Sequence, residues 1–249
     1  MAKNFTGKYV DGRKCIYCGK YKLYRLPNKQ VKCGSCGRFY SLSKIKRDLE
    51  VLYYFSLELS ANKTADLLGL DYKTVRSRYM LFRKKISEYL DSDFKKLSGE
   101  LEVDESYFGG KRKGKRGRGA FNKVVVLGIL ERNGKVYTAI VPDVSAETLM
   151  TEIRNKTEKG SVYYTDCFKS YKSLKRYGKH RKINKEHAYA KGRNHINGIE
   201  SFWAFAKERF HKYHGIRKDN YPLYLKEMEF RFNYRNKDLF KYLFEIIYR

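Results

Sequence analysis

The strongest constraint on this chain is a pair of Cys-x-x-Cys-Gly motifs near its start. Cys15 and Cys18 form the first motif, and Cys33 and Cys36 form the second, with fourteen residues between the two pairs. Each motif presents two thiolates to one ion, and its glycine lets the backbone turn tightly under the sulfurs. Four sulfurs complete the tetrahedral shell of Zn²⁺. The spacing therefore predicts a structural zinc site, with a redox pair or disulfides as the alternatives.

The segments beside these cysteines predict a zinc ribbon over residues 1–43. Residues 20–26 and 38–42 alternate in the manner of short strands. A unit of this size cannot fold on its core alone, so metal binding is expected to supply its stability. Its sequence leaves open whether the ribbon contacts DNA or another protein.

The net charge of the chain narrows the choice of partners. Lysine and arginine number 55 against 27 aspartate and glutamate residues, which gives a formal charge of +28 over 249 residues. Such an excess favours nucleic acid over a membrane surface or a merely basic protein. The chain has no apolar run of about 18 residues, so we expect neither a membrane span nor a secretory signal. The predicted location is the cytoplasm, associated with the nucleoid, where reduced cysteines serve as metal ligands.

Residues 44–90 have helical periodicity and predict a helix-turn-helix segment. A first helix is expected from Lys44, a second over 62–68, and Gly69 separates the second from a third helix that begins at Asp71. A plain three-helix packing module is the alternative, and the net charge favours DNA binding. The side chains expected to meet bases or phosphates are Tyr72, Lys73, Thr74, Arg76 and Arg78.

A second basic element lies within residues 111–119, which hold six positive charges and three glycines. So many unpaired charges are too costly to bury, so this segment cannot pack in a core. We expect a flexible arm that lies along a phosphate backbone, with an ordinary solvated loop as the alternative. The basic residues of this arm are Lys111, Arg112, Lys113, Lys115, Arg116 and Arg118.

The second half of the chain predicts a mixed α/β domain over residues 100–249, after a linker over 91–99. A strand near its start is followed by strands at 124–130 and 135–141, a helix over 145–156, a further strand and further helices. This order of elements resembles the ribonuclease H-like fold. The expected architecture is therefore a catalytic α/β domain behind a zinc ribbon and a helical DNA-binding segment.

Three carboxylates in this domain suggest a metal site. Asp104 and Asp166 lie in or at the end of short β-branched and aromatic runs, and Glu200 lies on an amphipathic helix. Hard cations such as Mg²⁺ prefer oxygen ligands and keep waters that substrate phosphate can replace. Glu102 shares a strand face with Asp104 and is a lesser candidate, whereas Glu105 points to the opposite face.

Three pieces of sequence carry a resemblance to a known family. They are Val-Asp-Glu-Ser-Tyr-Phe-Gly-Gly at 103–110, Tyr-Thr-Asp at 164–166, and His-Ile-Asn-Gly-Ile-Glu-Ser-Phe-Trp at 195–203, followed by Lys207. The chain resembles bacterial insertion-sequence transposases of the aspartate-aspartate-glutamate (DDE) type. More narrowly, it resembles the group in which a zinc ribbon and a helical DNA-binding segment precede the catalytic domain.

The resemblance implies a role for each matching residue. Asp104, Asp166 and Glu200 would form the catalytic triad that binds Mg²⁺ or Mn²⁺, and Lys207 would contact substrate phosphate. Asn197 lies one turn before Glu200 on the same stripe of the helix and would assist or compete with it. Trp203, the only tryptophan of the chain, is expected to pack in the core.

The resemblance also implies an activity and its partners. The protein would bind double-stranded DNA at the ends of its element, cut a strand, and join the new end to target DNA. Holding two ends calls for a homo-oligomer on the DNA. A non-catalytic DNA-binding regulator derived from a transposase is the main alternative, and a nuclease that cuts without strand transfer is another.

Overall fold

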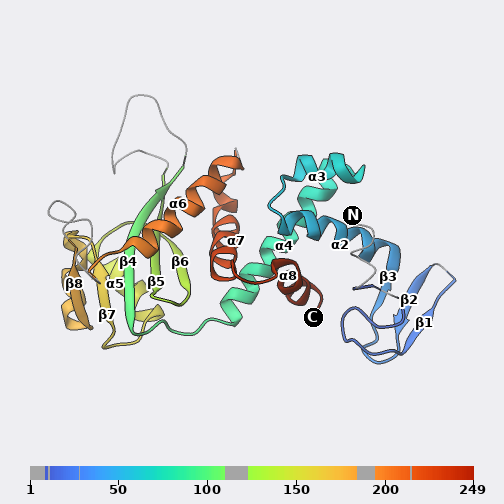
Figure 1. The fold of residues 1–249 in the computed structure, drawn as a ribbon, viewed down its shortest axis with the longest axis horizontal. Helices are drawn as coiled ribbons and strands as arrows, with labels where there is room; N and C mark the ends of the chain where they lie inside the picture. Colours follow the sequence, from blue (N-terminus) through green and yellow to red (C-terminus); the bar gives the residue numbers. More distant parts are fainter. Residues whose placement is uncertain (1–8, 11, 28, 110–122, 184–193, 214) are drawn as a thin grey trace. The chain divides into compact units, whose positions relative to one another are not determined.

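The computed structural model divides the chain into two compact units (Figure 1). Unit 1 comprises Met1–Tyr89 and Tyr234–Arg249, and unit 2 comprises Leu90–Asn233. The structure describes residues 9–10, 12–27, 29–109, 123–183, 194–213 and 215–249. The basic arm predicted within residues 111–119 lies outside this described part of the chain.

Unit 1 begins with a three-stranded antiparallel ribbon. Its strands are β1 (Leu23–Arg25), β2 (Gln30–Cys33) and β3 (Phe39–Ser41), in that order across the sheet. Val31 and Tyr40 face each other across β2 and β3 and are buried on the inner side. The Cys-Gly turns lie at the ends of these short strands, as expected for a zinc ribbon.

Three helices follow the ribbon in unit 1. They are α2 (Leu42–Ser56), α3 (Ala61–Leu68) and α4 (Tyr72–Ser92). Gly69 ends α3 in the left-handed conformation, which glycine adopts at little cost, and this sharp turn leads directly into α4. The core between the helices is aromatic, with the rings of Phe55, Tyr79 and Phe82 within 6.5 Å of one another.

Helix α8 (Leu239–Tyr248) completes unit 1, where it packs against α2. Phe240, Leu243 and Phe244 form its buried side, and Asp238 caps its first turn. The mixed α/β domain was predicted to extend to residue 249, whereas the structure places Tyr234–Arg249 in unit 1. The physical reason is that the apolar face of α8 is buried by a helix from the first part of the chain.

Unit 2 is built on a five-stranded sheet in the order β6-β5-β4-β7-β8. Strands β4, β5 and β6 are antiparallel neighbours, and β7 and β8 add in parallel to β4. This order and direction are those of the ribonuclease H-like fold, which confirms the predicted fold class. The strand bounds are β4 Glu100–Phe108, β5 Val124–Glu131, β6 Val136–Val141, β7 Val162–Thr165 and β8 Lys179–Lys182.

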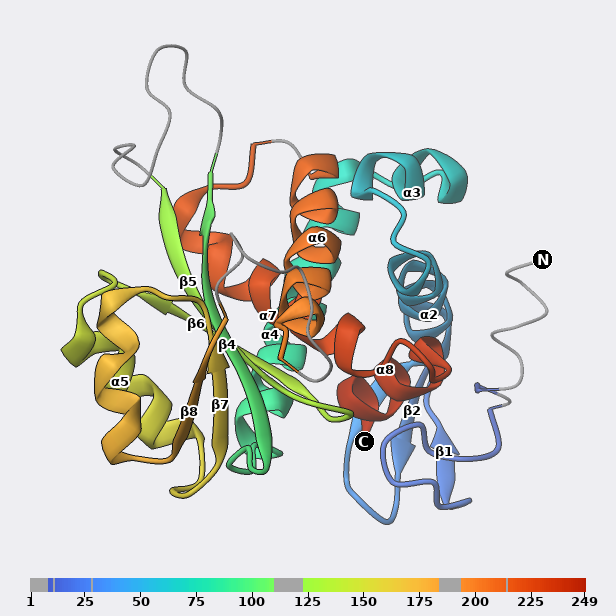
Figure 2. The ribbon, with the colours of Figure 1, turned by 60° about the vertical axis from the view of Figure 1, so that its left-hand side comes forward.

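Helices cover both faces of this sheet (Figure 2). Helix α5 (Ala146–Lys156) and the short 3₁₀ helix η1 (Lys169–Arg176) pack on one face. Helices α6 (Asn197–Lys212) and α7 (Tyr221–Asn233) pack on the other, with the 3₁₀ turn η2 (Lys218–Asn220) just before α7. Each face therefore has its own apolar core, and β4 contributes to both.

The edge strand β6 is protected by side chains of α7. Asn233 accepts from the Val136 N–H at 2.8 Å and donates to the Val136 carbonyl at 2.9 Å. One turn earlier, Glu229 accepts from the Thr138 N–H at 2.8 Å, and Lys226 donates to the Thr138 carbonyl at 3.1 Å. A polar stripe on a helix thus takes the place of a sixth strand, which satisfies an edge that would otherwise pair with another chain.

The structure differs from the sequence analysis at two further places. The predicted linker over 91–99 begins inside α4, and Leu97 is buried and bridges to Thr157. The short polar strand β8 had no apolar alternation to indicate it. Within the described residues, no helix is long and apolar enough to span a membrane.

Candidate active site

Asp104 lies in the central strand of the sheet and faces α6. Its Oδ2 accepts a hydrogen bond from the Trp203 indole Nε1 at 3.1 Å. Gly128 is directly opposite Asp104 on β5, and a Cβ at Gly128 would lie 2.6 Å from the Trp203 ring. This glycine therefore lets α6 approach the sheet closely enough for the indole to fix the carboxylate. A glycine inside an apolar strand is the sequence signal that could have indicated this contact.

Asp166 follows the last residue of the neighbouring strand β7. The parallel register pairs Glu102 with Tyr164, so Asp104 and Asp166 each follow these last paired residues by two positions. The Asp166 Oδ1 accepts from the Phe168 N–H at 2.9 Å, which fixes the turn after the strand. Parallel pairing of β4 and β7 thus gathers two acids that are far apart in sequence.

The buried Tyr171 on η1 lies on the opposite face of the sheet, and the charges of both acids affect its pKa. Burial raises the pKa of Tyr171 well above its ordinary value, and the charges of Glu105, Asp104 and Asp166 raise it further. The Tyr171 hydroxyl donates to Glu105 Oε2 at 2.8 Å. Glu105 is therefore held on the far face from Asp104, as its place in the strand predicts.

Glu200 and Lys207 lie along one stripe of α6 above Asp104. The neighbouring stripe packs through Ile199 and Trp203, while Glu200 is half-buried and Lys207 is exposed as a whole residue. Partial loss of water around its ammonium lowers the pKa of Lys207, and the Asp104 carboxylate opposes that shift. The effect of Asp104 shows that the ammonium and this carboxylate are electrostatic neighbours.

A buried ionic network holds the beginning of α6 against the sheet. Glu102 is 1% exposed, and its Oε2 accepts the Ile199 N–H at 2.9 Å, a donor that no capping side chain within α6 satisfies. Its Oε1 accepts from Arg132 Nε at 2.9 Å, and Arg132 also donates to the His195 carbonyl. The Arg132 guanidinium lies 3.7 Å from the centre of the Tyr164 ring.

Glu102 is therefore engaged in holding the helix, although it shares a face with Asp104. No role for Arg132 was predicted from the sequence, because an arginine after a strand is common and because its partners come from distant segments. This network sets where α6 starts, and so where Glu200 lies.

The four cysteines of unit 1 form a compact group. The sulfurs of Cys15 and Cys36 are 3.7 Å apart, those of Cys18 and Cys33 are 3.6 Å apart, and all four lie within 4.8 Å of one another. Backbone N–H groups of Cys36 and Ser35 point at the Cys33 sulfur and hold the pKa of its thiol at about 6. Thiolate donors at this spacing fit a single tetrahedral Zn²⁺.

The carboxylates of unit 2 are arranged less tightly. Among the described residues only the cysteine group brings its ligand atoms within 4.8 Å of one another, and Asp104, Asp166 and Glu200 do not form such a group. Their oxygens are the donors that Mg²⁺ and Mn²⁺ prefer. The donor set therefore fits a divalent cation.

The residues predicted to read DNA lie at the start of α4. Tyr72, Lys73, Thr74 and Arg76 are exposed there, and the Thr74 N–H is capped by Asp71 at 3.2 Å. Arg78 differs from its neighbours, because its Nε pairs with Asp48 of α2 at 3.0 Å. Arg78 therefore braces two helices as well as adding positive charge.

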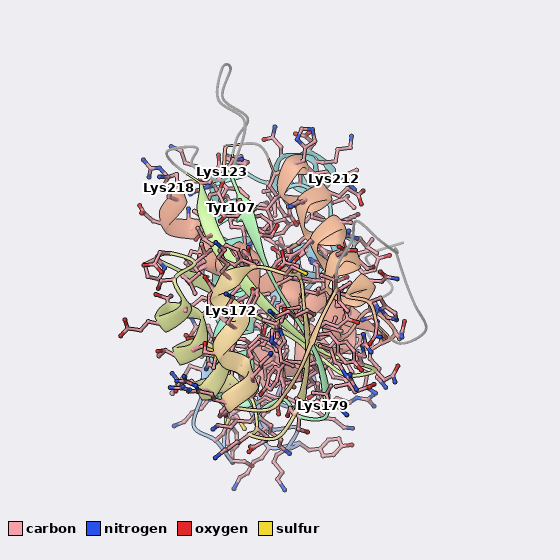
Figure 3. The ribbon with its side chains drawn as sticks, turned by 90° about the vertical axis from the view of Figure 1, so that its left-hand side faces the viewer. Tyr107, Lys123, Lys172, Lys179, Lys212 and Lys218 are labelled. Atoms are coloured by element: carbon pink, nitrogen blue, oxygen red, sulfur yellow. The ribbon has the colours of Figure 1, made fainter. Side chains whose placement is uncertain are left out.

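Basic side chains also occur around the end of unit 2 where β4 and β5 leave the sheet. Figure 3 shows Tyr107, Lys123 and Lys218 toward this end, and Lys123 contributes to the lowered pKa of Lys207. Lys123 therefore places positive charge near Lys207, whose ammonium also feels the Asp104 carboxylate.

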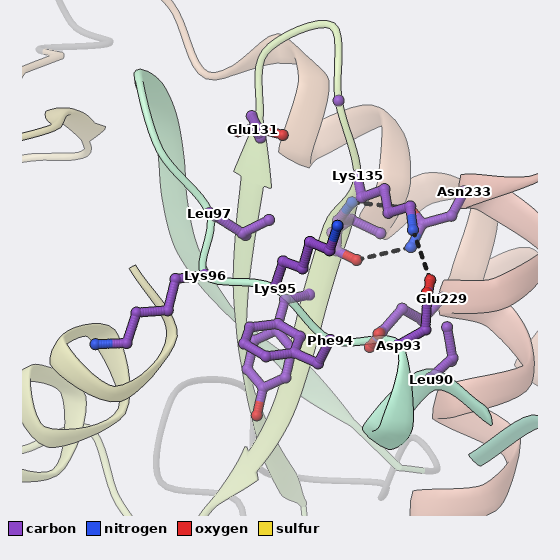
Figure 4. A pocket seen from close by; sticks show the side chains of 13 residues that line it. Leu90, Asp93, Phe94, Lys95, Lys96, Leu97, Glu131, Lys135, Glu229 and Asn233 are labelled. Carbon is purple, nitrogen blue, oxygen red and sulfur yellow. Dashed lines mark hydrogen bonds and ion pairs between the residues drawn. The ribbon is translucent and has the colours of Figure 1, made fainter. Parts of the chain in front are cut away.

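A cavity of about 300 Å³ in unit 2 is separate from the carboxylates. Figure 4 shows Phe94, Lys135 and Asn233 among its lining side chains. Lys135 pairs with Asp93 at 3.1 Å across it. Neither the three candidate acids nor Lys207 lines this cavity, so it is not the candidate active site.

The fold and the site together define a class of protein. It is a ribonuclease H-like domain with acids on its central strands and on the helix above them, attached to a cysteine-bearing ribbon and helices. The model of the ISXO2-like transposase domain matches residues 96–233. The chain belongs to this transposase family.

One curated protein and two solved structures are similar to parts of this chain. An uncharacterized transposase-like protein of Haemophilus influenzae is 46% identical over 100 residues, which cover 40% of this chain and 81% of that protein. Among solved structures, the Mos1 transposase paired-end complex with left transposon end aligns with 80% of this chain and 75% of its own, at 14% identity and a TM-score of 0.34. The Mos1 strand transfer complex aligns with a TM-score of 0.28 and 12% identity over 80% of this chain and 76% of its own.

Proposed function

We propose that this protein is the transposase of an insertion sequence, which cuts DNA at the ends of its element and joins them to target DNA. The observation that carries the proposal is the parallel pairing of β4, which bears Asp104, with β7, which Asp166 follows. Trp203 of α6, the helix that also bears Glu200, donates a hydrogen bond to Asp104. Membership of a transposase family supports the same activity.

Asp104, Asp166 and Glu200 would hold Mg²⁺ or Mn²⁺. When bound, such ions neutralise the charge of the phosphodiester and activate the attacking oxygen. Trp203 orients Asp104 through its indole N–H, and the Glu102 and Arg132 pair fixes the start of α6. The Asp104 carboxylate raises the pKa of the Lys207 ammonium against the effect of burial, and Lys207 would contact a phosphate oxygen of the DNA.

The remaining parts would bind DNA and stabilise the fold. The start of α4, with Tyr72, Lys73, Thr74 and Arg76, would contact the duplex, together with Arg78 and the basic arm within 111–119. Cys15, Cys18, Cys33 and Cys36 would bind a structural Zn²⁺. The partner would be double-stranded DNA, with two or more copies of the chain holding both element ends.

The test is nicking of supercoiled DNA by the purified protein with Mg²⁺ or Mn²⁺. Wild type is compared with Asp104→Asn, Asp166→Asn and Glu200→Gln, and Glu147→Gln on the exposed side of α5 serves as the matched control. We expect the triad variants to lose cleavage by a factor on the order of 10³ or more, while duplex binding and the control remain unchanged. A wild type that binds the element ends but never cuts them favours the regulator alternative.

A further inference from the structure

The outer face of the ribbon carries exposed aromatic rings in a fixed row. In the strand register Tyr24 pairs with Lys32, and Lys32 pairs with Phe39, so the three side chains lie side by side on one face. Tyr24 is 51% exposed and Phe39 is 57% exposed, and Tyr21, just before β1, is 70% exposed. Large rings presented to water in this way are typical of a binding surface.

The rings are held in place before any partner binds. Tyr24 lies against Gly34, where a Cβ would come within 2.7 Å of its ring, and about half of the tyrosine remains exposed. The Lys32 ammonium is 5.2 Å from the centre of the Phe39 ring. This row of Tyr24, Lys32 and Phe39 is called the aromatic face below.

The charged residues in the sequence around the aromatic face are all basic. Residues 12–43 contain eight lysines and arginines and no aspartate or glutamate. Four thiolates around one Zn²⁺ would remove only two of these charges. An acidic partner is therefore favoured over a basic or neutral one.

We propose that the aromatic face binds unpaired bases of single-stranded DNA. Lysines alone suffice for the phosphates of a duplex, whose bases are already stacked on one another. Exposed rings gain energy by stacking on the flat face of a partner, and every unpaired base provides such a face. The inference rests on the proposed function in taking DNA as the partner, but it does not depend on the carboxylate chemistry.

The test measures how tightly the full, zinc-loaded chain binds two DNA duplexes in the absence of added Mg²⁺. Both carry the same short single-stranded tail, but one tail is abasic and so keeps its phosphates without its bases. We expect wild type to bind the natural tail about 5-fold to about 150-fold more tightly, the range for stacking of a base on an aromatic ring. The double variant Tyr24→Leu, Phe39→Leu should lose this preference.

Two controls make the result specific. Each variant must still bind one zinc per chain, which shows that the ribbon is folded. Tyr72→Leu, an exposed tyrosine on α4, should weaken duplex binding and leave the preference for the natural tail unchanged.

Equal affinity of wild type for the two tails, or a double variant that keeps the preference, would overturn the inference. Loss of self-association in the double variant with an unchanged tail preference would overturn it too, and would identify a protein interface instead. Failure to bind any duplex would contradict the proposed function itself.

Discussion

The two sets of candidate metal ligands differ in how the chain brings them together. The four sulfurs come from two short turns and lie within 4.8 Å of one another. The three carboxylates come from β4, from the residue after β7 and from α6, so their relative positions depend on strand pairing and helix packing. The first site is local, and the second depends on the whole of unit 2.

This difference predicts how each site responds to the loss of one of its ligands. A compact thiolate group is expected to hold its ion permanently and to lend the ribbon its stability. Separated carboxylates, held by Trp203 and by the Glu102 network, are suited to an ion that is shared with substrate phosphate. Substitution of a cysteine should therefore unfold the ribbon, whereas substitution of one of the three acids should abolish DNA cleavage.

The largest effect is expected at the cysteines. Cys33→Ser should abolish zinc binding and unfold the ribbon, because structural zinc contributes on the order of 10 kcal/mol to such units. Zinc content per chain and amide hydrogen exchange of β1 to β3 measure the change. Asp104→Asn is the matched control and should leave both unchanged. A folded ribbon without zinc would remove the contrast between the two sites.

The next effect concerns the network that positions α6. Arg132→Met should destabilise unit 2 by about 3–5 kcal/mol, because it leaves the buried Glu102 without its cationic partner. Urea unfolding measures this, and DNA cleavage should fall as Glu200 shifts with the helix. Lys135→Met breaks the exposed pair with Asp93 and should cost at most about 1 kcal/mol. Equal costs for both variants would contradict the positioning role of Arg132.

A smaller effect is expected where α7 protects the sheet edge. Asn233→Leu leaves the Val136 N–H and carbonyl without their partners, at a cost of about 2–4 kcal/mol in unfolding free energy. Thermal or urea unfolding gives the value, and dimer formation through the freed edge is detectable by sedimentation. The exposed Asn236→Leu is the control and should change little. An unchanged stability for Asn233→Leu would show that water replaces the side chain.

The smallest effect is a pH dependence at Glu229. Burial raises the pKa of this carboxyl above its ordinary value, with Lys226 and Thr138 opposing the shift. The native state therefore holds this proton to higher pH than the unfolded state, and the contribution of Glu229 falls as the pH rises above about 4.5, the ordinary pKa of glutamate. Relative to Glu229→Gln, wild type should lose stability as the pH rises through this window. Parallel stability curves for the two proteins would contradict the shift.

Much of the fold follows from local signals in the sequence. The Cys-x-x-Cys-Gly turns, the glycine between α3 and α4, and the short apolar runs of β5 and β6 each act over a few residues. The ribonuclease H-like fold was expected from the order of elements along the chain, and the structure confirms this fold class. Strand β8 was missed because Lys179–Lys182 is entirely polar, so nothing in its sequence separates it from a loop.

The residue types of the candidate site were predictable from the sequence, but the contacts that hold these residues in place were not. Asp104, Asp166 and Glu200 were selected by pattern and by resemblance. The hydrogen bond from Trp203 and the close approach over Gly128 needed coordinates. Each of these contacts joins segments that are far apart in the chain, so the sequence does not show that they meet.

By itself, the sequence determined the features that depend on neighbours along the chain: the four thiol ligands, the helical periods, the excess of positive charge and the carboxylates. Tertiary structure alone decided which face Asp104 shares with α6, how α7 closes the edge of β6, and that α8 belongs with α2. The physical reason is that backbone hydrogen bonds and apolar burial between distant segments are satisfied jointly. No short stretch of residues specifies its distant partner.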